Sequence, residues 1–325
     1  MNNKIRVGIV GYGNLGRGVE LALSQNEDFE LEAIFTRRDP SKVDANSKMV
    51  HISKIEDYKG KIDVMILCGG SALDLPEQGP KIVENFNTID SFDTHARIPK
   101  YFKAMDEVAK KSGTIGLISI GWDPGLFSLN RILSEAVLPN GKDYTFWGTG
   151  VSQGHSDAIR RVEGVKNGVQ YTVPVKNAIQ RVRSGENPEL AVSEKHNRVC
   201  YVVAEEEADT KKIEEEIKNM PNYFADYDTE VHFVTEDILK SQHSGMPHGG
   251  FVIRTGNTSD GNNQRIEFSL KLSSNPQFTA SVIVAYARAV YRLSKEGKKG
   301  AHTIFDIPLS YISPKSLEEL RAELL

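Results

Sequence analysis

Cysteine is nearly absent from this sequence: Cys68 and Cys200 are the only two among 325 residues. Each lies in a strand-like run rich in valine and isoleucine, which favours a reduced, buried thiol over a disulfide. Long apolar runs are absent too, because no stretch reaches the roughly 18 residues that a membrane span needs. No apolar segment precedes the first predicted strand at Ile5. We therefore expect neither a membrane span nor secretion, and a cytoplasmic protein.

Neither sign of charge dominates the chain. The 40 Lys and Arg residues against 44 Asp and Glu residues give a formal net charge of -4. Without a basic surplus, nothing in the composition indicates binding to nucleic acid. Hydrophobic residues at 39% and charged residues at 26% are typical of a globular protein. The length is sufficient for two domains that each bury a substantial core.

The chain does contain an apolar strand that leads directly into a glycine-rich turn and a helix. The strand ends at Val10, and the turn is Gly11-Tyr12-Gly13-Asn14-Leu15-Gly16. In this G-x-G-x-x-G pattern, Gly11 allows the tight turn and Gly13 lets the backbone approach a pyrophosphate, while Gly16 lets the helix pack closely on the strand. Glycine-rich turns are common, but the position between a strand and a helix predicts a dinucleotide-binding site.

The end of the second predicted strand indicates which dinucleotide binds. After Leu31–Phe35 come Thr36, Arg37 and Arg38. An NAD site would usually have Asp or Glu here to bind the ribose hydroxyls. Two guanidinium groups and a hydroxyl suit a 2′-phosphate, which arginine binds through charge-assisted hydrogen bonds. A solvated basic turn is the alternative, but with the glycine motif upstream the sequence favours NADP.

Two further predicted strands end in small or polar residues. They run from Ile62 to Cys68 and from Asn87 to about Asp93. The carboxyl ends of parallel strands line the ligand edge of a doubly wound sheet. We therefore expect the following residues to border the cofactor: Cys68, Gly69, Gly70, Ser71, Ala72, Asp90, Ser91, Phe92 and Asp93.

A fifth strand, Thr114–Ile120, leads into Gly121-Trp122-Asp123-Pro124-Gly125. Gly121 is expected to lie at the same cofactor edge as the other strand ends. The proline keeps Asp123 out of helical geometry, so its carboxylate should remain at this edge beside a large aromatic ring. Nicotinamide and substrate would meet there. The alternative is that Asp123 only forms the turn before Pro124.

The second half of the chain has a different pattern of predicted strands and helices. Apolar strand candidates, from Tyr144–Trp147 to Arg265–Leu272, are separated by helical stretches, which predicts a mixed α+β sheet. Helical spacing from Phe278 to Lys295 indicates a core or dimer helix rather than a membrane-surface helix. The expected fold class is α/β: an N-terminal Rossmann doubly wound parallel sheet at 1–122, then an α+β substrate-binding and dimerisation domain at 123–300. Residues 301–325 could pack back on the first domain.

Six segments in this order and spacing resemble the meso-diaminopimelate dehydrogenase family. They are Gly11–Gly16, Thr36–Arg38, Gly121–Gly125, Phe146-Trp147-Gly148, Ser152–Asp157 and Met246–Gly250. The resemblance covers essentially the whole chain. It implies a homodimeric, NADP-dependent enzyme that oxidatively deaminates the D-configured centre of meso-2,6-diaminopimelate to L-2-amino-6-oxopimelate and ammonia. The reverse reaction would supply a precursor of lysine and peptidoglycan.

The chemistry of such a reaction sets requirements for the site. Hydride leaves a carbon that bears an amine only when the amine is neutral, so a carboxylate or relay must lie beside it. A wall must also hold the carbon against the nicotinamide. Asp123 and Asp93 can supply the carboxylate, with Asp123 the better candidate for orienting the amine or accepting its proton. Trp122 and Trp147 can supply the wall, and the resemblance adds Gln153, Gly154 and Asp157 nearby.

The far end of the substrate carries a second carboxylate and a second amine, which require a cation and polar partners. The resemblance assigns this role to Thr172, Arg198, His248 and Asn275. Taken alone, Arg198 could be an exposed charge at a strand end and His248 an ordinary loop histidine. No histidine has the HExxH or Cys/His spacing of a metal site, and hydride transfer needs no metal.

Two other functions fit part of the sequence. Another NADP-dependent two-domain reductase of the lysine or aspartate pathway, such as a semialdehyde or dihydrodipicolinate reductase, would share the first domain. It would not need the distal residues. A non-enzymatic NADP-sensing protein would keep the glycine loop and the arginine pair, but it would not need a polar cluster around Trp122 and Asp123. Reduction of NADP on adding meso-diaminopimelate separates all three.

Overall fold

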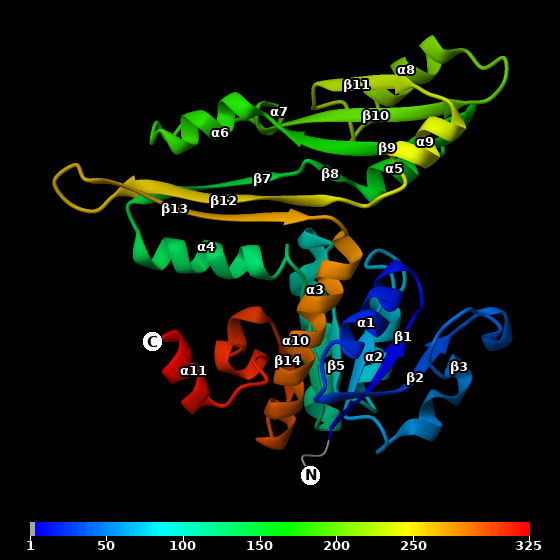
Figure 1. The fold of residues 1–325 in the computed structure, drawn as a ribbon, viewed down its shortest axis with the longest axis vertical. Coiled ribbons are helices and arrows are strands. Elements are labelled where there is room, and N and C mark those ends of the chain that lie inside the picture. Colours follow the sequence, from blue (N-terminus) through cyan, green and yellow to red (C-terminus); the bar gives the residue numbers. More distant parts are fainter. Residues whose placement is uncertain (1–3) are drawn as a thin grey trace. The chain divides into compact units, whose positions relative to one another are not determined.

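The computed structural model describes residues 4–325, which form two compact units (Figure 1). The first unit contains the chain up to Leu129 and again from Pro276, and the second contains Asn130–Asn275. Met1 to Asn3, which precede the first predicted strand, lie outside the described residues. Among the described residues, no helix is long and apolar enough to cross a membrane.

The first unit is built on a seven-stranded parallel sheet of order β14-β6-β5-β4-β1-β2-β3. The order reverses between β1 and β4, since the chain runs outward from β1 to β3 and then resumes on the other side of β1. Ligands of doubly wound sheets bind at such a switch point. The strands are β1 (Ile5–Val10), β2 (Phe29–Thr36), β3 (Met49–His51), β4 (Val64–Leu67), β5 (Thr88–Asp90), β6 (Ile115–Leu117) and β14 (Gly300–His302).

Helices cover both faces of this sheet, which is why its strands are apolar almost throughout. Side chains of β1, β2 and β4 alternate between two buried clusters, one shared with α1 and α10 and the other with α2 and α3. The α-helices of the first unit are α1 (Asn14–Ser24), α2 (Leu75–Val83), α3 (Ile98–Ser112), α10 (Asn275–Lys295) and α11 (Leu317–Leu324). Its 3-10 helices are η1 (Pro40–Lys42), η2 (Ile52–Tyr58), η3 (His95–Arg97), η4 (Ile304–Asp306) and η5 (Leu309–Ile312).

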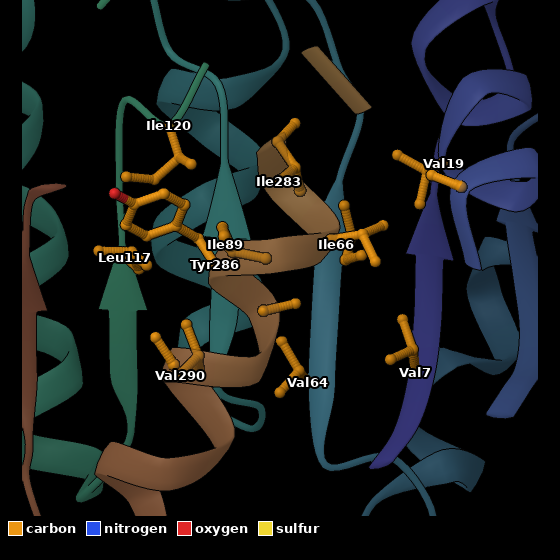
Figure 2. Close-up of a cluster of buried hydrophobic side chains, with 14 of the residues drawn as sticks. Val7, Val19, Val64, Ile66, Ile89, Leu117, Ile120, Ile283, Tyr286 and Val290 are labelled. Carbon is orange, nitrogen blue, oxygen red and sulfur yellow. The ribbon is translucent and has the colours of Figure 1, made fainter. Parts of the chain in front are cut away.

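Helix α10 is a core helix of the first unit. Figure 2 shows Ile283, Tyr286 and Val290 on α10 among apolar side chains of the sheet, and all three belong to its buried cluster. Complete burial of such a side chain contributes roughly 1.5–3 kcal/mol. The buried guanidinium of Arg288 also bonds Asp28, with Nε 2.5 Å from Oδ2. This helix therefore ties the chain back to the first sheet.

Both domain boundaries differ from those expected from the sequence. The first unit continues past residue 122, because Leu126 and Leu129 at the start of α4 (Leu126–Val137) pack against its core. The chain returns to it at Pro276 rather than at residue 301. The chain returns this early because α10 packs on the first sheet. The spacing of apolar residues along α10 did not show which sheet the helix covers.

The second unit contains two sheets, one of four strands in the order β11-β10-β9-β8 and one of three strands in the order β13-β12-β7. All neighbours are antiparallel except β10 and β11. The elements are β7 (Gly141–Trp147), β8 (Gly150–Val151), α5 (Gln153–Ile159), β9 (Val165–Pro174), α6 (Lys176–Arg183), α7 (Val192–Lys195), β10 (His196–Ala204), α8 (Thr210–Lys218), β11 (Thr229–Phe233), α9 (Glu236–Gln242), β12 (His248–Asn257) and β13 (Asn263–Leu272).

Each sheet of the second unit has its own core. Cys200 and Val202 of β10 pack with Ile213 and Ile217 of α8, while α6 packs on β7 and β12. Both cysteines of the chain are unpaired. The predicted fold class is confirmed: a Rossmann doubly wound sheet is joined to a second unit with mixed and antiparallel sheets.

Candidate active site

The glycine-rich turn has the geometry that its sequence predicts. Gly11 adopts φ +93°, a conformation that side chains disfavour. A Cβ on Gly16 would overlap the carbonyl oxygen of Gly11, whereas a Cβ on Gly13 would have no atom within 4 Å. Gly16 thus lets α1 begin directly over the turn, and Gly13 leaves space for a bound group. The first N–H groups of α1 are then available to an anion.

This turn lines a cavity of about 320 Å³ at the switch point of the first sheet. The ends of β2 and β4 complete the cavity, through Thr36, Arg37, Arg38, Cys68 and Gly69. The structure therefore brings together the three segments that the sequence assigned to the dinucleotide. Asp74 and Gln78, which the sequence analysis did not single out, line the same cavity. Nothing marked them in the sequence, since both look like ordinary polar residues around a helix start.

The two arginines are held at the cavity by neighbouring groups. Nη1 of Arg37 lies 2.9 Å from Oδ1 of Asp74, and the other oxygen of Asp74 accepts the N–H of Gly70 at 3.0 Å. Arg38 donates from Nη2 to the carbonyl oxygen of Tyr12 at 2.7 Å, which links the end of β2 to the glycine turn. The protein thus orients both guanidinium groups at this cavity.

Tyr12 is fixed within the glycine turn. Its hydroxyl bonds the buried carboxylate of Glu20, and the guanidinium of Arg17 lies 4.6 Å from the centre of its ring. Burial, together with the carboxylate of Glu20, raises the pKa of Tyr12 to about 12, so the hydroxyl stays protonated. The side chain therefore braces the loop, and its backbone carbonyl is what Arg38 contacts.

Two residues predicted to border the cofactor, Asp90 and Phe92, are buried at the end of β5. Asp90 is completely buried and accepts hydrogen bonds from the backbone of Phe92 and Ser119 and from the hydroxyl of Tyr101. Burial raises its pKa to about 6. The ring of Phe92 stacks on Tyr101 with centroids 4.3 Å apart. Asp90 thus links the end of β5 to the segment after β6 and to Tyr101 of α3. That Asp90 and Phe92 border the cofactor stays a prediction.

The neighbouring polar residues lie at the surface of the same strand ends. The hydroxyl of Ser71 accepts the backbone N–H of Asp93 at 3.1 Å, so the loops after β4 and β5 are in contact. The carboxylate of Asp93 is exposed. Ser91 is half-buried, and Ala72 is exposed. These residues share one edge of the sheet, as predicted for strands that end together.

The segment after β6 folds back on itself. Gly121 and Gly125 are bridged, and a Cβ on Gly125 would overlap the backbone of Gly121, which explains the glycine at this position. The ring of Trp122 is buried edge-on against Phe127 with centroids 5.3 Å apart. Asp123 is half-buried, and its peptide bond to Pro124 is cis. The turn thus leaves a carboxylate partly accessible beside a fixed indole.

In the second unit, β9 and β10 place Arg198 directly opposite Thr172. Nη1 of Arg198 donates to the Thr172 hydroxyl at 2.6 Å. The arginine is only 7% exposed, and within residues 4–325 its Nε has no hydrogen-bond partner and no Asp or Glu forms an ion pair with it. Burial lowers its pKa. A buried cation without a counter-ion is costly, so this arrangement favours an anionic ligand.

His248 lies next to the same pair. Gly150 of β8 is the register partner of Thr172, and a Cβ on Gly150 would overlap the imidazole of His248. The missing side chain at Gly150 therefore makes room for the histidine. Thr172 and Arg198 thus face each other on β9 and β10, and His248 at the start of β12 lies against Gly150, the register partner of Thr172.

The other predicted residues of the second unit lie on α5 or next to Met246. Gln153 approaches the sulfur of Met246 through Nε2 at 2.9 Å, and the backbone N–H of Asn275 donates to the Met246 carbonyl at 2.9 Å. Gly154 is exposed in the first turn of α5. Asp157 is also exposed and forms an ion pair with Arg160. The carboxylate of Asp157 is therefore already engaged by a cation.

Two histidines were missed in the sequence. His196 accepts the backbone N–H of Trp147 at 2.8 Å and stacks on its indole with centroids 5.3 Å apart. Burial lowers the pKa of His196 to about 3, and burial with the nearby charge of Arg198 lowers that of His155 to about 4. Both are neutral near pH 7. Alternation along β10 could have revealed His196, because it lies two residues before Arg198 on the same face.

Comparison with known proteins identifies the family of this chain. Residues 121–274 match the family model described as the diaminopimelic acid dehydrogenase C-terminal domain. The meso-diaminopimelate D-dehydrogenase of Ureibacillus thermosphaericus is 66% identical over 325 residues, covering 99% of this chain and 100% of the relative. This chain belongs to the meso-diaminopimelate dehydrogenase family. The family predicted from the sequence is confirmed.

Solved structures of meso-diaminopimelate dehydrogenases have the same fold. A multiple mutant of the enzyme from Clostridium tetani E88, solved with DAP, is 66% identical with a TM-score of 0.95 and covers 99% of this chain and 100% of its own. An engineered D-amino acid dehydrogenase bound to NADP+ is 42% identical with a TM-score of 0.88, again over 99% and 100%. The relationship therefore extends over both units.

Proposed function

We propose that the protein is an NADP-dependent dehydrogenase that oxidatively and reversibly deaminates the D-centre of meso-2,6-diaminopimelate. The products are L-2-amino-6-oxopimelate and ammonia. The observation that carries this proposal is the buried guanidinium of Arg198, which has no counter-ion among residues 4–325 and lies beside the hydroxyl of Thr172. The distal carboxylate of the substrate supplies the missing charge. The enzyme belongs to the biosynthesis of lysine and of peptidoglycan precursors.

The reacting end of the substrate is handled by Asp123, which orients the amine and accepts its proton. NADP+ takes the hydride from the α-carbon, and water then releases ammonia from the resulting imine. In the first unit, Trp122 supplies an aromatic wall and Asp93 is the second candidate carboxylate. In the second unit, Trp147 supplies a further aromatic wall and Gln153, Gly154 and Asp157 contribute polar groups, whereas Thr172, Arg198, His248 and Asn275 bind the distal carboxylate and amine.

The cofactor site is assigned to the cavity of the first unit. Its glycine turn, Gly11 to Gly16, binds the pyrophosphate, and Thr36, Arg37 and Arg38 bind the 2′-phosphate. The loop after β4, from Cys68 to Ala72, borders the cofactor together with Ser91 and Gly121. In this assignment the first unit is the dinucleotide-binding domain, and the second binds the substrate.

Neither alternative function requires the residues assigned to the distal end of the substrate. A reductase of another lysine or aspartate intermediate does not require a buried cation beside Thr172. A protein that only senses NADP needs neither this cation nor Asp123. The second unit therefore supports the dehydrogenase, because a buried cation without a counter-ion is costly and an anionic ligand lowers that cost.

One assay tests the proposal. Purified protein and NADP+ are mixed with the meso, LL or DD isomer of diaminopimelate in separate wells, and NADPH formation is followed. We expect reduction with the meso isomer and none with the LL isomer, which lacks a D-centre. Absence of NADPH with the meso isomer, or equal rates with the LL isomer, would contradict the proposed function.

We further infer a homodimer that works in the cytoplasm. Exposed apolar side chains on α4, namely Ile132, Leu133 and Val137, support an interface on this helix. Each is at least 48% exposed, which is costly in a monomer. Light scattering would test the dimer, with an expected mass of twice the 36.1 kDa chain.

Cofactor selection leads to a direct prediction. Replacing Arg37 and Arg38 together by alanine should raise the KM for NADP steeply, because each lost charged partner typically costs about 1.5–3 kcal/mol. That corresponds to about tenfold to over a hundredfold in affinity per arginine. Steady-state kinetics with NADP and NAD measure the effect, and the exposed Arg161→Ala serves as a control. An equal rise in the KM for NADP and for NAD would contradict the assignment of the two arginines to the 2′-phosphate.

A further inference from the structure

The buried guanidinium of Arg198 has a second neighbour besides Thr172. Its central carbon lies 3.8 Å from the ring centre of Tyr227, over the face of the ring. Tyr227 belongs to the segment between α8 and β11. Sequence patterns gave no indication of this residue, because it stands in an irregular polar stretch.

The segment that carries Tyr227 is firmly attached to the unit. The completely buried ring of Phe224 anchors it in the core beside α8, and the N–H of Tyr227 donates to the Phe224 carbonyl at 2.9 Å. The carbonyl of Asp228 accepts the backbone N–H of Arg198 at 2.8 Å. The residues on either side of Tyr227, Phe224 before it and Asp228 after it, thus hold its ring over the guanidinium.

The face of an aromatic ring can stabilise a buried cation without occupying its hydrogen-bond donors. The negative face of an aromatic ring stabilises a cation that lacks a counter-ion, and it does so most strongly where water is excluded. Aspartate or glutamate at this position would also stabilise Arg198, but it would occupy the N–H donors that must bind a ligand carboxylate. Stacking leaves those edge donors available. Thr172 accepts from Nη1, and among residues 4–325 Nε has no hydrogen-bond partner.

We propose that Tyr227 is a positioning residue that selects substrates with a distal carboxylate by holding the guanidinium of Arg198 under its ring. This inference rests on the proposed function. Tyr227 does not contact the reacting atoms in this assignment. It keeps the charge of Arg198 stable before the substrate arrives and keeps its planar edge aimed for two hydrogen bonds to a carboxylate.

The test compares two substitutions at the same position. Tyr227→Leu removes the ring face, whereas Tyr227→Phe keeps it and removes only the hydroxyl. We expect the KM for meso-diaminopimelate to rise about 5- to 30-fold in the leucine variant. In the phenylalanine variant it should stay within about threefold of wild type. The KM for NADP and the thermal midpoint should be unchanged in both.

Two controls separate positioning from simple packing. Tyr223→Leu removes a ring from the same segment that packs edge-on against His155 instead of Arg198, so it should leave the KM for meso-diaminopimelate nearly unchanged. In an Arg198→Met background, Tyr227→Leu should have no further effect, because the cation it holds is gone. Equal KM increases in all three tyrosine variants, or an additive loss in the double variant, would overturn the proposal.

A binding measurement keeps this inference distinct from the proposed function. Pimelate, a dicarboxylate without amines, is titrated into wild type and both Tyr227 variants by calorimetry. Weaker binding to the leucine variant alone supports the role of Tyr227, even if the wild type does not oxidise meso-diaminopimelate, a result that would refute only the proposed function. Identical pimelate affinities in wild type and the leucine variant would refute the role of Tyr227.

Discussion

Replacing Asp123 by asparagine is expected to lower turnover of meso-diaminopimelate about 10²- to 10⁴-fold, the range for loss of an acid–base group. The change keeps the size of the side chain but removes its negative charge. The turn geometry set by Gly121 and Gly125 should survive, because it depends on the backbone. Steady-state kinetics give the turnover, and fluorescence titration should show that NADP still binds.

Asp93→Asn is the matched comparison for this variant. Asp93 is an exposed carboxylate on a loop of the same sheet edge, and its backbone N–H, which bonds Ser71, is untouched by the substitution. If Asp123→Asn stays within about threefold of wild type while Asp93→Asn loses turnover, the acid–base role belongs to Asp93. If neither variant changes, water handles the proton.

Replacing Arg198 by methionine should reduce kcat/KM for meso-diaminopimelate by about 2–5 kcal/mol, the usual cost of truncating one partner of a buried charge pair. Most of the loss should appear in KM, because the distal carboxylate binds away from the reacting carbon. Activity on long apolar D-amino acids should rise, since methionine leaves an apolar surface where a charge stood. Kinetics with meso-diaminopimelate and D-norleucine measure both effects.

Stability and cofactor binding provide the controls for Arg198→Met. The arginine is buried without a counter-ion in the part of the chain that the structure describes, so an apolar residue of similar volume should leave the thermal midpoint unchanged or raise it. The KM for NADP, which depends on the first unit, should stay constant. A loss of activity with unchanged KM for meso-diaminopimelate and no gain on any D-amino acid would mean that Arg198 supports the fold or the hydride geometry.

Local patterns predicted much of the cofactor site. The roles of Gly11 and Gly16 depend on the backbone conformation and on contacts within a few residues of the chain. The arginines at the end of β2 follow a strand that is recognisable from its apolar run. Parallel strands that end together place these segments at one edge of the sheet. The rule that ligands bind at the carboxyl ends of such strands therefore predicted where the cavity lies.

Other features could not be predicted, because they depend on which distant segments pack together. Asp90 ends a strand like its neighbours, yet its carboxylate faces inward to Tyr101 and the backbone of Ser119. Helical spacing identified α10 as a buried helix but not the sheet that it covers. Both features depend on contacts between residues that are far apart in the chain.

The sequence by itself determined the fold class, the family and the preference for NADP, since each depends on motifs whose chemistry is local and whose order is fixed along the chain. Only the tertiary structure decided where the first unit resumes, that Arg198 is buried without a counter-ion, and that His196 and Tyr227 hold Trp147 and Arg198 in place. Burial and side-chain partners are properties of packing between segments. A residue in an irregular stretch, such as Tyr227, therefore carries no local mark of its role.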